Sequence, residues 1–502
     1  MISLSRTLVA GCLALLTIKS SLIAAQGSPT GNVVSHVDTS LKGSQKFTLR
    51  VDGKPFYMTN VQVRLDKLRY AWGWDAAARE AILARAAADG FNTVSLPIHW
   101  YEVEPSKDEF RWDILDEYLS VAQKHGLKVE LLWFGQNSGG HAQWLGDPKT
   151  DPVHLRTPDY VLYSPGPGSK ETTSDYTIRR EMSAYSLDLA DERMKEREAY
   201  VLGKVMDHVA DWDAANGSKR TVIGVQLGNE VAGIKVQFPD SLVISYMSHV
   251  GEAVKKSRYS TWTRMNCVYS HVVTRVMANE TLRANGGTNI DFVGIDTYRH
   301  HFRTDRQFIE SMRTNVPETG KNYKMVMEAN GSIPVSAILP VAALSGNSTF
   351  AFYEMIGPDN YGLYEREGDM GFKPRGSYIE DVRTVNRLFV GAMTDLALNA
   401  SGAGLFVHNW TGDTNTPTVS ADGIAFTPAS RDSQAISIKR SKDEIVLLNS
   451  KGGRFDLPES LKIKRVSKGY FDKDNVWVDQ GEVPFTKSGI SPPAGTIVRL
   501  TL

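Results

Sequence analysis

The chain has 502 residues, of which 41% are apolar and 23% charged, a composition typical of a globular protein with room for more than one domain. Lys plus Arg equals Asp plus Glu, 57 of each, so the formal net charge is zero. This balance gives no support for a nucleic-acid or anionic-membrane partner, because binding to either relies on a basic surface.

Residues 1–25 are typical of a secretory signal peptide. Arg6 precedes an apolar stretch at 8–16, and the small residues Ala24 and Ala25 stand where cleavage is expected. A membrane anchor is the alternative, but the apolar core is short for a bilayer span. We therefore expect a secreted, extracellular protein that has no membrane contact after cleavage.

Secretion affects what is expected of the cysteines and of the asparagines in glycosylation sequons. Cys12 leaves with the signal peptide, so the mature chain keeps only Cys267, for which a small, buried, apolar role is expected. Six Asn-x-Ser/Thr sequons would permit N-glycosylation, at Asn216, Asn279, Asn330, Asn347, Asn399 and Asn409.

Regular structure is predicted after residues 26–45, which are rich in Ser, Gly, Thr and Asn and predict an exposed lead-in. Short apolar runs then alternate with amphipathic stretches, as in parallel β/α units. Strands are predicted at 56–63, 91–97, 128–134, 221–228, 261–266, 291–297, 324–328 and 348–354. Helices are predicted at 75–89, 113–125, 191–212, 241–256, 270–284, 305–314, 334–345 and 377–399, and a long polar loop at 135–185.

These eight strand–helix units predict a (β/α)8 TIM barrel over residues 46–401. A doubly wound open sheet is the alternative. It would place a glycine-rich phosphate loop after the first strand, where residues 62–66 contain no glycine. Residues 402–502 hold short alternating segments separated by Gly, Asp, Asn and Pro, which predict a small all-β, sandwich-like C-terminal domain.

Two glutamates carry the functional prediction. Glu230 and Glu328 each follow a short apolar run typical of a buried parallel strand. Active sites of such barrels lie at the C-terminal ends of the strands, and strands four and seven lie nearly opposite each other. Either glutamate alone is explained as well by a salt bridge at the barrel rim, but the pair favours hydrolysis of a glycosidic bond, which needs two facing carboxyl groups. Asn229 is expected to hold a sugar hydroxyl beside Glu230.

The pair resembles glycoside hydrolase clan A, which has Asn-Glu on strand four and Glu on strand seven. Residues 89–113, with their Gly-Phe-Asn, Glu-Pro and Phe-Arg-Trp-Asp segments, are similar to the family 35 and family 42 β-galactosidases. Similar segments follow at 124–132, 142–145 and 224–230. The resemblance implies that Glu230 is the acid/base and Glu328 the nucleophile of a retaining double displacement that needs no cofactor.

Other residues at the strand ends are candidates for substrate binding. Tyr298 follows strand six, where a tyrosine in the clan often hydrogen-bonds the nucleophile, and packing on the rim is the alternative. Trp100 could stack on a sugar or be a core tryptophan. Asn137 could bind hydroxyls or cap a loop. Glu354 could contact hydroxyls or pair with an arginine.

No metal is expected, because His99, His300 and His301 lack the spacing of a metal-ligand set. The sequence therefore predicts a secreted retaining exo-glycosidase, β-galactosidase-like, that removes a terminal sugar from an oligosaccharide or glycan. Strand eight lacks the tryptophan familiar in those families, which bears on the choice of sugar. Two alternatives stay open: a catalytically retired barrel that only binds carbohydrate, and an endo-acting polysaccharide hydrolase.

Overall fold

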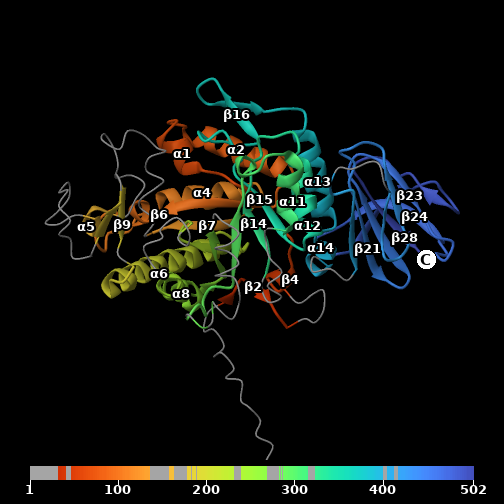
Figure 1. The fold of residues 1–502 in the computed structure, drawn as a ribbon. Helices are drawn as coiled ribbons and strands as arrows, with labels where there is room; N and C mark the ends of the chain where they lie inside the picture. The colour runs from red at the N-terminus through yellow and green to blue at the C-terminus, as the bar shows by residue number, and fades with distance from the viewer. Residues whose placement is uncertain are drawn as a thin grey trace, which may run out of the picture.

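The computed structural model shows a barrel with a β-rich domain at its side (Figure 1). The residues that it describes are 32–40, 47–135, 158–162, 178–181, 184–187, 189–230, 239–267, 282, 284, 286–314, 323–399, 404–411 and 417–502. The predicted signal peptide, Asn137, most of the 135–185 loop and all but two residues of the 270–284 helix lie outside these ranges.

Parallel strands close into an eight-stranded barrel, which confirms the predicted fold. The strands are β5 (Thr59–Gln62), β6 (Thr93–His99), β7 (Lys128–Phe134), β10 (Val222–Leu227), β12 (Trp262–Cys267), β13 (Phe292–Asp296), β14 (Met325–Glu328) and β15 (Thr349–Phe352). Each strand overlaps the range predicted for it. Strand β15 pairs with β5 and so closes the ring.

Helices surround the barrel (Figure 1). They are α1 (Leu65–Tyr70), α2 (Ala76–Ala88), α3 (Trp100–Val103), α4 (Asp113–Lys124), α5 (Asp159–Leu162), α6 (Glu192–Ala215), α8 (Asp240–Lys256), α11 (Asp305–Thr314), α12 (Leu339–Ser345), α13 (Ile379–Gly391) and α14 (Met393–Asn399), with 3-10 turns η3 (Arg299–His301) and η4 (Ser336–Ile338). Asp75 and Asp191 cap α2 and α6 by accepting backbone N–H groups. The predicted 377–399 helix is two helices, interrupted at Ala392. In the described part of the chain, no helix has the length and apolarity needed to cross a bilayer.

A small antiparallel sheet covers the N-terminal ends of the barrel strands. It consists of β2 (Ser35–Asp38), β3 (Thr48–Val51) and β4 (Lys54–Pro55), and β1 (Asn32–Val33) pairs with β11 (Tyr259–Ser260). Leu49 packs in one apolar cluster with Trp262 and Met325 at the starts of barrel strands. Val34 is only 1% exposed. The prediction of an exposed lead-in is therefore wrong at Val34 and Ser35, whereas Val33 is 41% exposed.

The C-terminal domain is a sandwich of two antiparallel sheets, as predicted. One sheet contains β18 (Leu405–His408), β21 (Ala435–Ser441), β22 (Glu444–Asn449), β28 (Thr496–Thr501), β24 (Arg465–Phe471) and β25 (Trp477–Glu482). The other contains β19 (Thr418–Val419), β20 (Ala425–Pro428), β23 (Gly453–Asp456), β27 (Gly489–Ile490) and β26 (Phe485–Thr486). Two hairpins lie earlier in the chain, outside this domain. They pair β8 (Ile178–Glu181) with β9 (Ala184–Leu187) and β16 (Tyr364–Glu367) with β17 (Gly371–Pro374).

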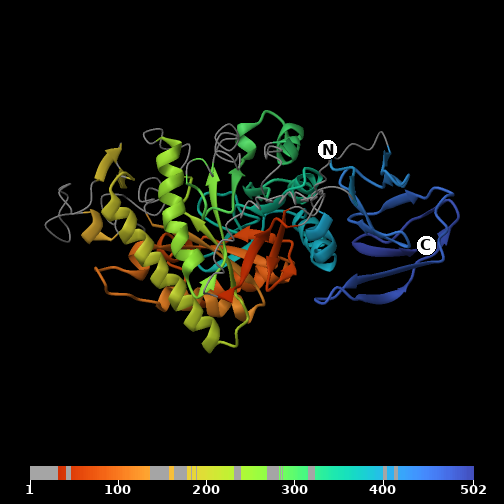
Figure 2. The ribbon, with the colours of Figure 1, turned by 90° about the horizontal axis from the view of Figure 1, so that it is seen from below.

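The larger sheet is buried on both faces. In β22, Ile445 and Leu447 pack inside the sandwich, whereas Val446 and Leu448 belong to the apolar cluster that includes α13 and the barrel. Successive side chains of a strand point to opposite faces, so one strand serves both cores. Figure 2 shows the sandwich beside the barrel, next to α13 and α14. The domain therefore packs on the barrel through an apolar seam.

Leu448→Ala is expected to lower the free energy of unfolding by about 2–5 kcal/mol, because Leu448 is 1% exposed in this seam and the change leaves a cavity. Urea denaturation followed by tryptophan fluorescence measures the loss. Val476→Ala is the control, since Val476 is 59% exposed and its loss should change stability by less than about 0.5 kcal/mol. Equal effects of the two changes would contradict a packed seam.

Candidate active site

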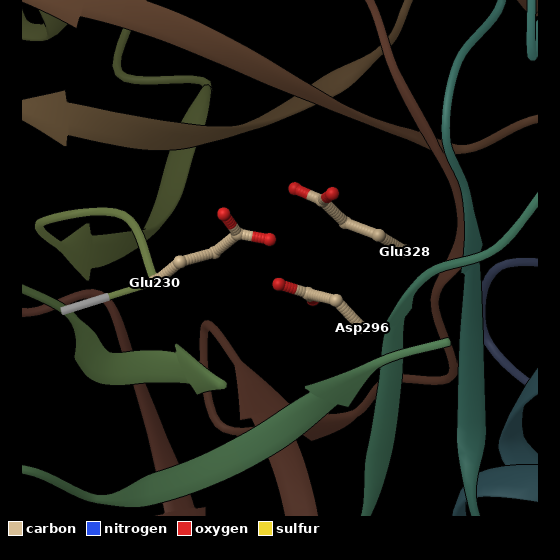
Figure 3. Close-up of side chains that lie close together, drawn as sticks. All are labelled: Glu230, Asp296 and Glu328. Atoms are coloured by element: carbon tan, nitrogen blue, oxygen red, sulfur yellow. The ribbon is translucent and has the colours of Figure 1, made fainter. Parts of the chain in front are cut away.

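Three carboxyl groups meet at the C-terminal ends of the barrel strands. Glu230 follows β10 after a turn, Asp296 is the last residue of β13, and Glu328 is the last residue of β14. Figure 3 shows the three side chains pointing toward one another. One carboxylate oxygen from each residue lies within 4.8 Å of those from the other two. This close approach of Glu230 and Glu328 is compatible with the separation of about 5–5.5 Å between the two carboxyl groups of retaining glycosidases.

The backbone after β10 turns Glu230 toward this cluster. Gly228 adopts a φ of 70° and Glu230 a φ of 49°, both in the left-handed region. Glycine enters this region without strain, whereas a glutamate there is uncommon and must be held by its surroundings. The Glu230 backbone N–H donates to Asn266 Oδ1 at 2.8 Å, which fixes the turn.

Asn229 lies beside the acid but its carbonyl is already held. Its Oδ1 accepts a hydrogen bond from Gln226 Nε2 at 3.1 Å and another from Asn266 Nδ2 at 3.0 Å. The side chain is 5% exposed. These contacts fix the orientation of Asn229, and its binding to a sugar hydroxyl stays a prediction.

Tyr298 hydrogen-bonds the second glutamate. Its hydroxyl donates to Glu328 Oε2. This donor stabilises the ionised form of Glu328 and opposes the effect of burial on its pKa. Tyr298 thus lies where the predicted contact requires, and it orients the carboxylate that a nucleophilic role would need.

A polar network inside the barrel supports the three acids from below. Arg264 on β12 donates to both carboxylate oxygens of Glu130 on β7, one of them at 2.8 Å, and Arg264 is also bonded to Gln226. The Arg264 and Glu130 side chains are 2% and 0% exposed. Gln226 continues the network to Asn229, and Asn266 Nδ2 donates to Asp296 Oδ2 at 2.7 Å. The carboxyl cluster is therefore anchored through several strands at once.

Two cations flank the cluster from the side of β5. Arg64 pairs with Asp66, and Lys67 pairs with Asp359 and donates to the Tyr353 hydroxyl at 2.9 Å. Both cations lower the pKa of Glu328, although less than its hydrogen bond with Tyr298 does. They therefore help Glu328 to ionise.

Burial is the main influence on the protons of the three acids. Burial, followed by the charge of Glu328, raises the pKa of Glu230 to about 8. Burial raises the pKa of Asp296 well above its ordinary range, and the charges of Glu328 and Glu230 add to the rise. Burial also raises the pKa of Glu328, against the opposing effects of Tyr298 and the two cations. The site therefore favours an ionised Glu328 beside a protonated Glu230.

The remaining predicted site residues are Trp100, Glu354 and Asn137. Trp100 is 0% exposed and its Nε1–H donates to Glu104 Oε2 at 2.8 Å, so it is a core tryptophan and the prediction of a sugar-stacking face is corrected. Glu354 is also 0% exposed, against Gly357, where an added Cβ would lie 2.1 Å from its carboxylate. Burial raises the pKa of Glu354 to about 7. Asn137 lies outside the described residues.

Asp296, Arg264 and Glu130 were not among the predicted site residues. A signal for them exists, because Arg264 and Asp296 are each the single charged residue of a strand, and Glu130 stands among the apolar residues of β7, whose other charge is Lys128 at its start. A charge buried in a barrel interior needs a partner on another strand. The sequence does not say which strand supplies that partner.

Among the described residues these three acids form the group whose oxygens come close enough to share an ion. Metal ligands must be deprotonated, whereas burial without an ion raises the pKa of Glu230 and of Asp296. Without an ion, protons reduce the repulsion among the three acids, and the absence of a metal stays a prediction.

Comparisons with known proteins give structural likeness only. No protein-family model matches the sequence, and no curated protein does. Solved structures similar to the chain include endo-glycoceramidase II from Rhodococcus sp., with 15% identity, a TM-score of 0.48 and coverage of 90% of this chain and 98% of that one. An exo-beta-1,4-mannosidase from Opitutaceae bacterium strain TAV5 has 14% identity, a TM-score of 0.48 and coverage of 73% and 64%. A family 39 glycoside hydrolase from Bacteroides cellulosilyticus WH2 has 11% identity, a TM-score of 0.44 and coverage of 91% and 84%.

These likenesses are too distant to bear on activity. The TM-scores lie below 0.5, and the identities are 15% or less. The more specific resemblance to families 35 and 42 stays a prediction. The geometry of the site is therefore the better guide to function.

Glu230→Gln is expected to stabilise the protein more at pH 8 than at pH 5. Between the ordinary carboxyl value of 4.5 and about 8, native Glu230 keeps a proton that the unfolded chain has released, so stability falls as pH rises. The glutamine has no such proton to lose. Thermal unfolding across this pH range should therefore show a gap in melting temperature, variant minus wild type, that widens with pH.

Glu459→Gln is the matched control, because Glu459 is exposed on the C-terminal domain. It should show no gap that changes with pH. A constant gap for Glu230→Gln would mean that Glu230 is ionised in the native protein throughout.

Proposed function

We propose that the protein is a retaining glycoside hydrolase with Glu328 as nucleophile and Glu230 as acid/base. The observation that carries this proposal is the approach of the two carboxyls to within 4.8 Å, with the Tyr298 hydroxyl bonded to one of them. A retaining enzyme needs this short spacing because one carboxylate must reach the anomeric carbon directly. An inverting enzyme holds its carboxyls about 6.5–9.5 Å apart to admit a water between them.

Exposure and contacts support the two roles. Glu328 is 5% exposed and is oriented by Tyr298, as a nucleophile that must approach one carbon atom requires. Glu230 is more exposed than Glu328, and its pKa of about 8 keeps it protonated near neutral pH. An acid/base must hold a proton in the first step and recover it from water in the second.

The reaction proceeds in two displacements. The Glu328 carboxylate forms a bond to the anomeric carbon while the bond to the leaving oxygen breaks, and Glu230 gives its proton to that oxygen. Water then attacks the anomeric carbon, Glu230 takes a proton from this water, and the Glu328 ester bond breaks. The sugar leaves with its original anomeric configuration.

The substrate we propose is an oligosaccharide or glycan that ends in a β-linked sugar, with β-galactosides first among the candidates. The sequence similarity to family 35 and family 42 enzymes at residues 89–113 supports this choice. We also propose secretion, directed by residues 1–25. Asn216 is an exposed sequon and the first candidate for glycosylation, whereas Asn330 and Asn409 are buried.

A panel of para-nitrophenyl β-galactoside, β-glucoside and β-mannoside tests the activity, and proton NMR of the first product tests the stereochemistry. We expect release from at least one glycoside and a β-anomer that later mutarotates. An α-anomer as the first product would overturn the retaining mechanism. Sugar binding without release from any glycoside would favour the carbohydrate-binding alternative.

Glu328→Gln is expected to abolish turnover of every substrate and leave folding intact, because the amide has nearly the same shape but cannot form the glycosyl ester. Activity on the best substrate of the panel and the circular dichroism spectrum measure both effects. Retained activity would rule out Glu328 as nucleophile.

Glu230→Ala is expected to slow phenyl glycosides by about 10²–10⁴-fold in kcat/KM and dinitrophenyl glycosides far less, because a good leaving group needs little protonation. Added azide should restore turnover and yield a β-glycosyl azide, since a small anion can enter the space of the lost carboxyl without proton removal. Equal losses for both leaving groups would contradict the acid/base role.

A further inference from the structure

The two displacements leave Asp296 without a role. Its side chain is 0% exposed and points toward both Glu230 and Glu328, with which it forms a triangle (Figure 3). Oδ2 accepts the hydrogen bond from Asn266 Nδ2, but Oδ1 has no hydrogen-bond partner among the described residues. A buried carboxylate oxygen without a donor is costly, and such a group calls for an explanation.

The neighbouring carboxyl of Glu230 supplies an explanation for this oxygen. An oxygen of Asp296 and one of Glu230 lie within 4.8 Å of each other, and a hydrogen bond with Asp296 would lower the pKa of Glu230. Two carboxyl groups can form a hydrogen bond only when one of them carries a proton. If Asp296 carries that proton, its hydrogen bond to Glu230 satisfies the buried carboxyl without a ligand or solvent.

Within the part of the chain that the structure describes, each cation near Asp296 is already paired with another acid. The titratable and charged groups that face it are Glu230, Glu328, Tyr298 and Arg264. Arg264 is bound by Glu130, and the Tyr298 hydroxyl is bound to Glu328. The two cations that act on Glu230 and Glu328 from the side of β5 are engaged by their own acids, as Arg64–Asp66 and Lys67–Asp359. Burial and the two glutamates raise the pKa of Asp296 accordingly.

We infer that Asp296 stays protonated through the catalytic cycle and donates a hydrogen bond to Glu230, which makes it the positioning residue of the acid/base. The inference rests on the proposed glycosidase function. It goes beyond that function by assigning a third carboxyl that sets the protonation of the site.

The proton balance of the cycle follows from this assignment. At rest Glu328 carries the negative charge, and Glu230 and Asp296 each hold a proton. After the first displacement Glu328 is an uncharged ester and Glu230 has become the carboxylate, which the Asp296 O–H stabilises. The second displacement takes a proton from water onto Glu230 and returns the charge to Glu328. The three acids together carry one negative charge at every stage.

Asp296→Asn and Asp296→Ala separate this role from a merely structural one. An asparagine can accept the Asn266 bond through Oδ1 and donate to Glu230 through Nδ2, whereas alanine can do neither. We expect kcat/KM for phenyl glycosides to fall about tenfold in the asparagine variant and about 10²–10³-fold in the alanine variant. The alkaline limb of the pH profile should move to higher pH in the alanine variant alone, because the Glu230 carboxylate has lost its donor.

Two results in kinetics would overturn the inference. Equal losses in the two variants with an unmoved alkaline limb would reduce Asp296 to a structural residue. A limb that moves to lower pH in Asp296→Asn would show that Asp296 works as an ionised group, whose charge had raised the pKa of Glu230.

An infrared difference spectrum at pH 7, wild type minus Asp296→Asn, tests the proton without any turnover. A carboxylic-acid C=O band that shifts in D₂O is expected, and its absence would overturn the inference. This arm is independent of the proposed function. If no glycoside is cleaved but the band is present, the proposed function fails and the protonated Asp296 stands. If glycosides are cleaved and the band is absent, the proposed function stands and the protonated Asp296 is overturned.

Discussion

The barrel holds three acidic side chains closer together than their charges allow. Within 4.8 Å of one another in a buried site, like charges repel strongly and desolvation disfavours each of them, so the cluster persists only if protons or opposite charges remove part of the charge. Tyr298 and the flanking cations favour the charge on Glu328. The other two acids must then hold protons, and a nucleophile beside a proton donor is the direct consequence.

The rigidity of the active site comes from polar side chains inside the barrel. Small barrels usually fill their interior with branched apolar side chains. Here Arg264 and Glu130 form an ion pair that is nearly inaccessible to water, and Gln226 and Asn266 extend it to the site. A buried ion pair of this kind contributes little net stability, because desolvation offsets its attraction. Its contribution is to fix the relative positions of the strands that carry the acids.

The sequence predicted the barrel because parallel strands buried on both faces leave a strong signal, and each of the strands overlaps its predicted range. It also predicted Glu230 and Glu328 from the strand ends. Trp100 was misjudged because a tryptophan after a strand looks the same whether it faces the pocket or the core, and only its contact with Glu104 decides. Asp296 was overlooked because glycoside hydrolysis requires only two carboxyl groups. Whether a third carboxyl lies close to them depends on strand register, which the sequence leaves open. The buried segment around Val34 was missed for a similar reason, since its burial comes from pairing with β11.

The C-terminal domain adds a constraint at a distance from the chemistry. Its larger sheet packs against α13 and α14, the helices that follow the last barrel strand, so the seam restrains the chain just after β15 closes on β5. β5 leads directly into Arg64 and Lys67, and β15 lies next to β14, which carries Glu328. The two cations that favour ionised Glu328 therefore follow directly on β5, one of the two strands whose pairing closes the ring, and the same ring closure holds them beside the strand that carries Glu328.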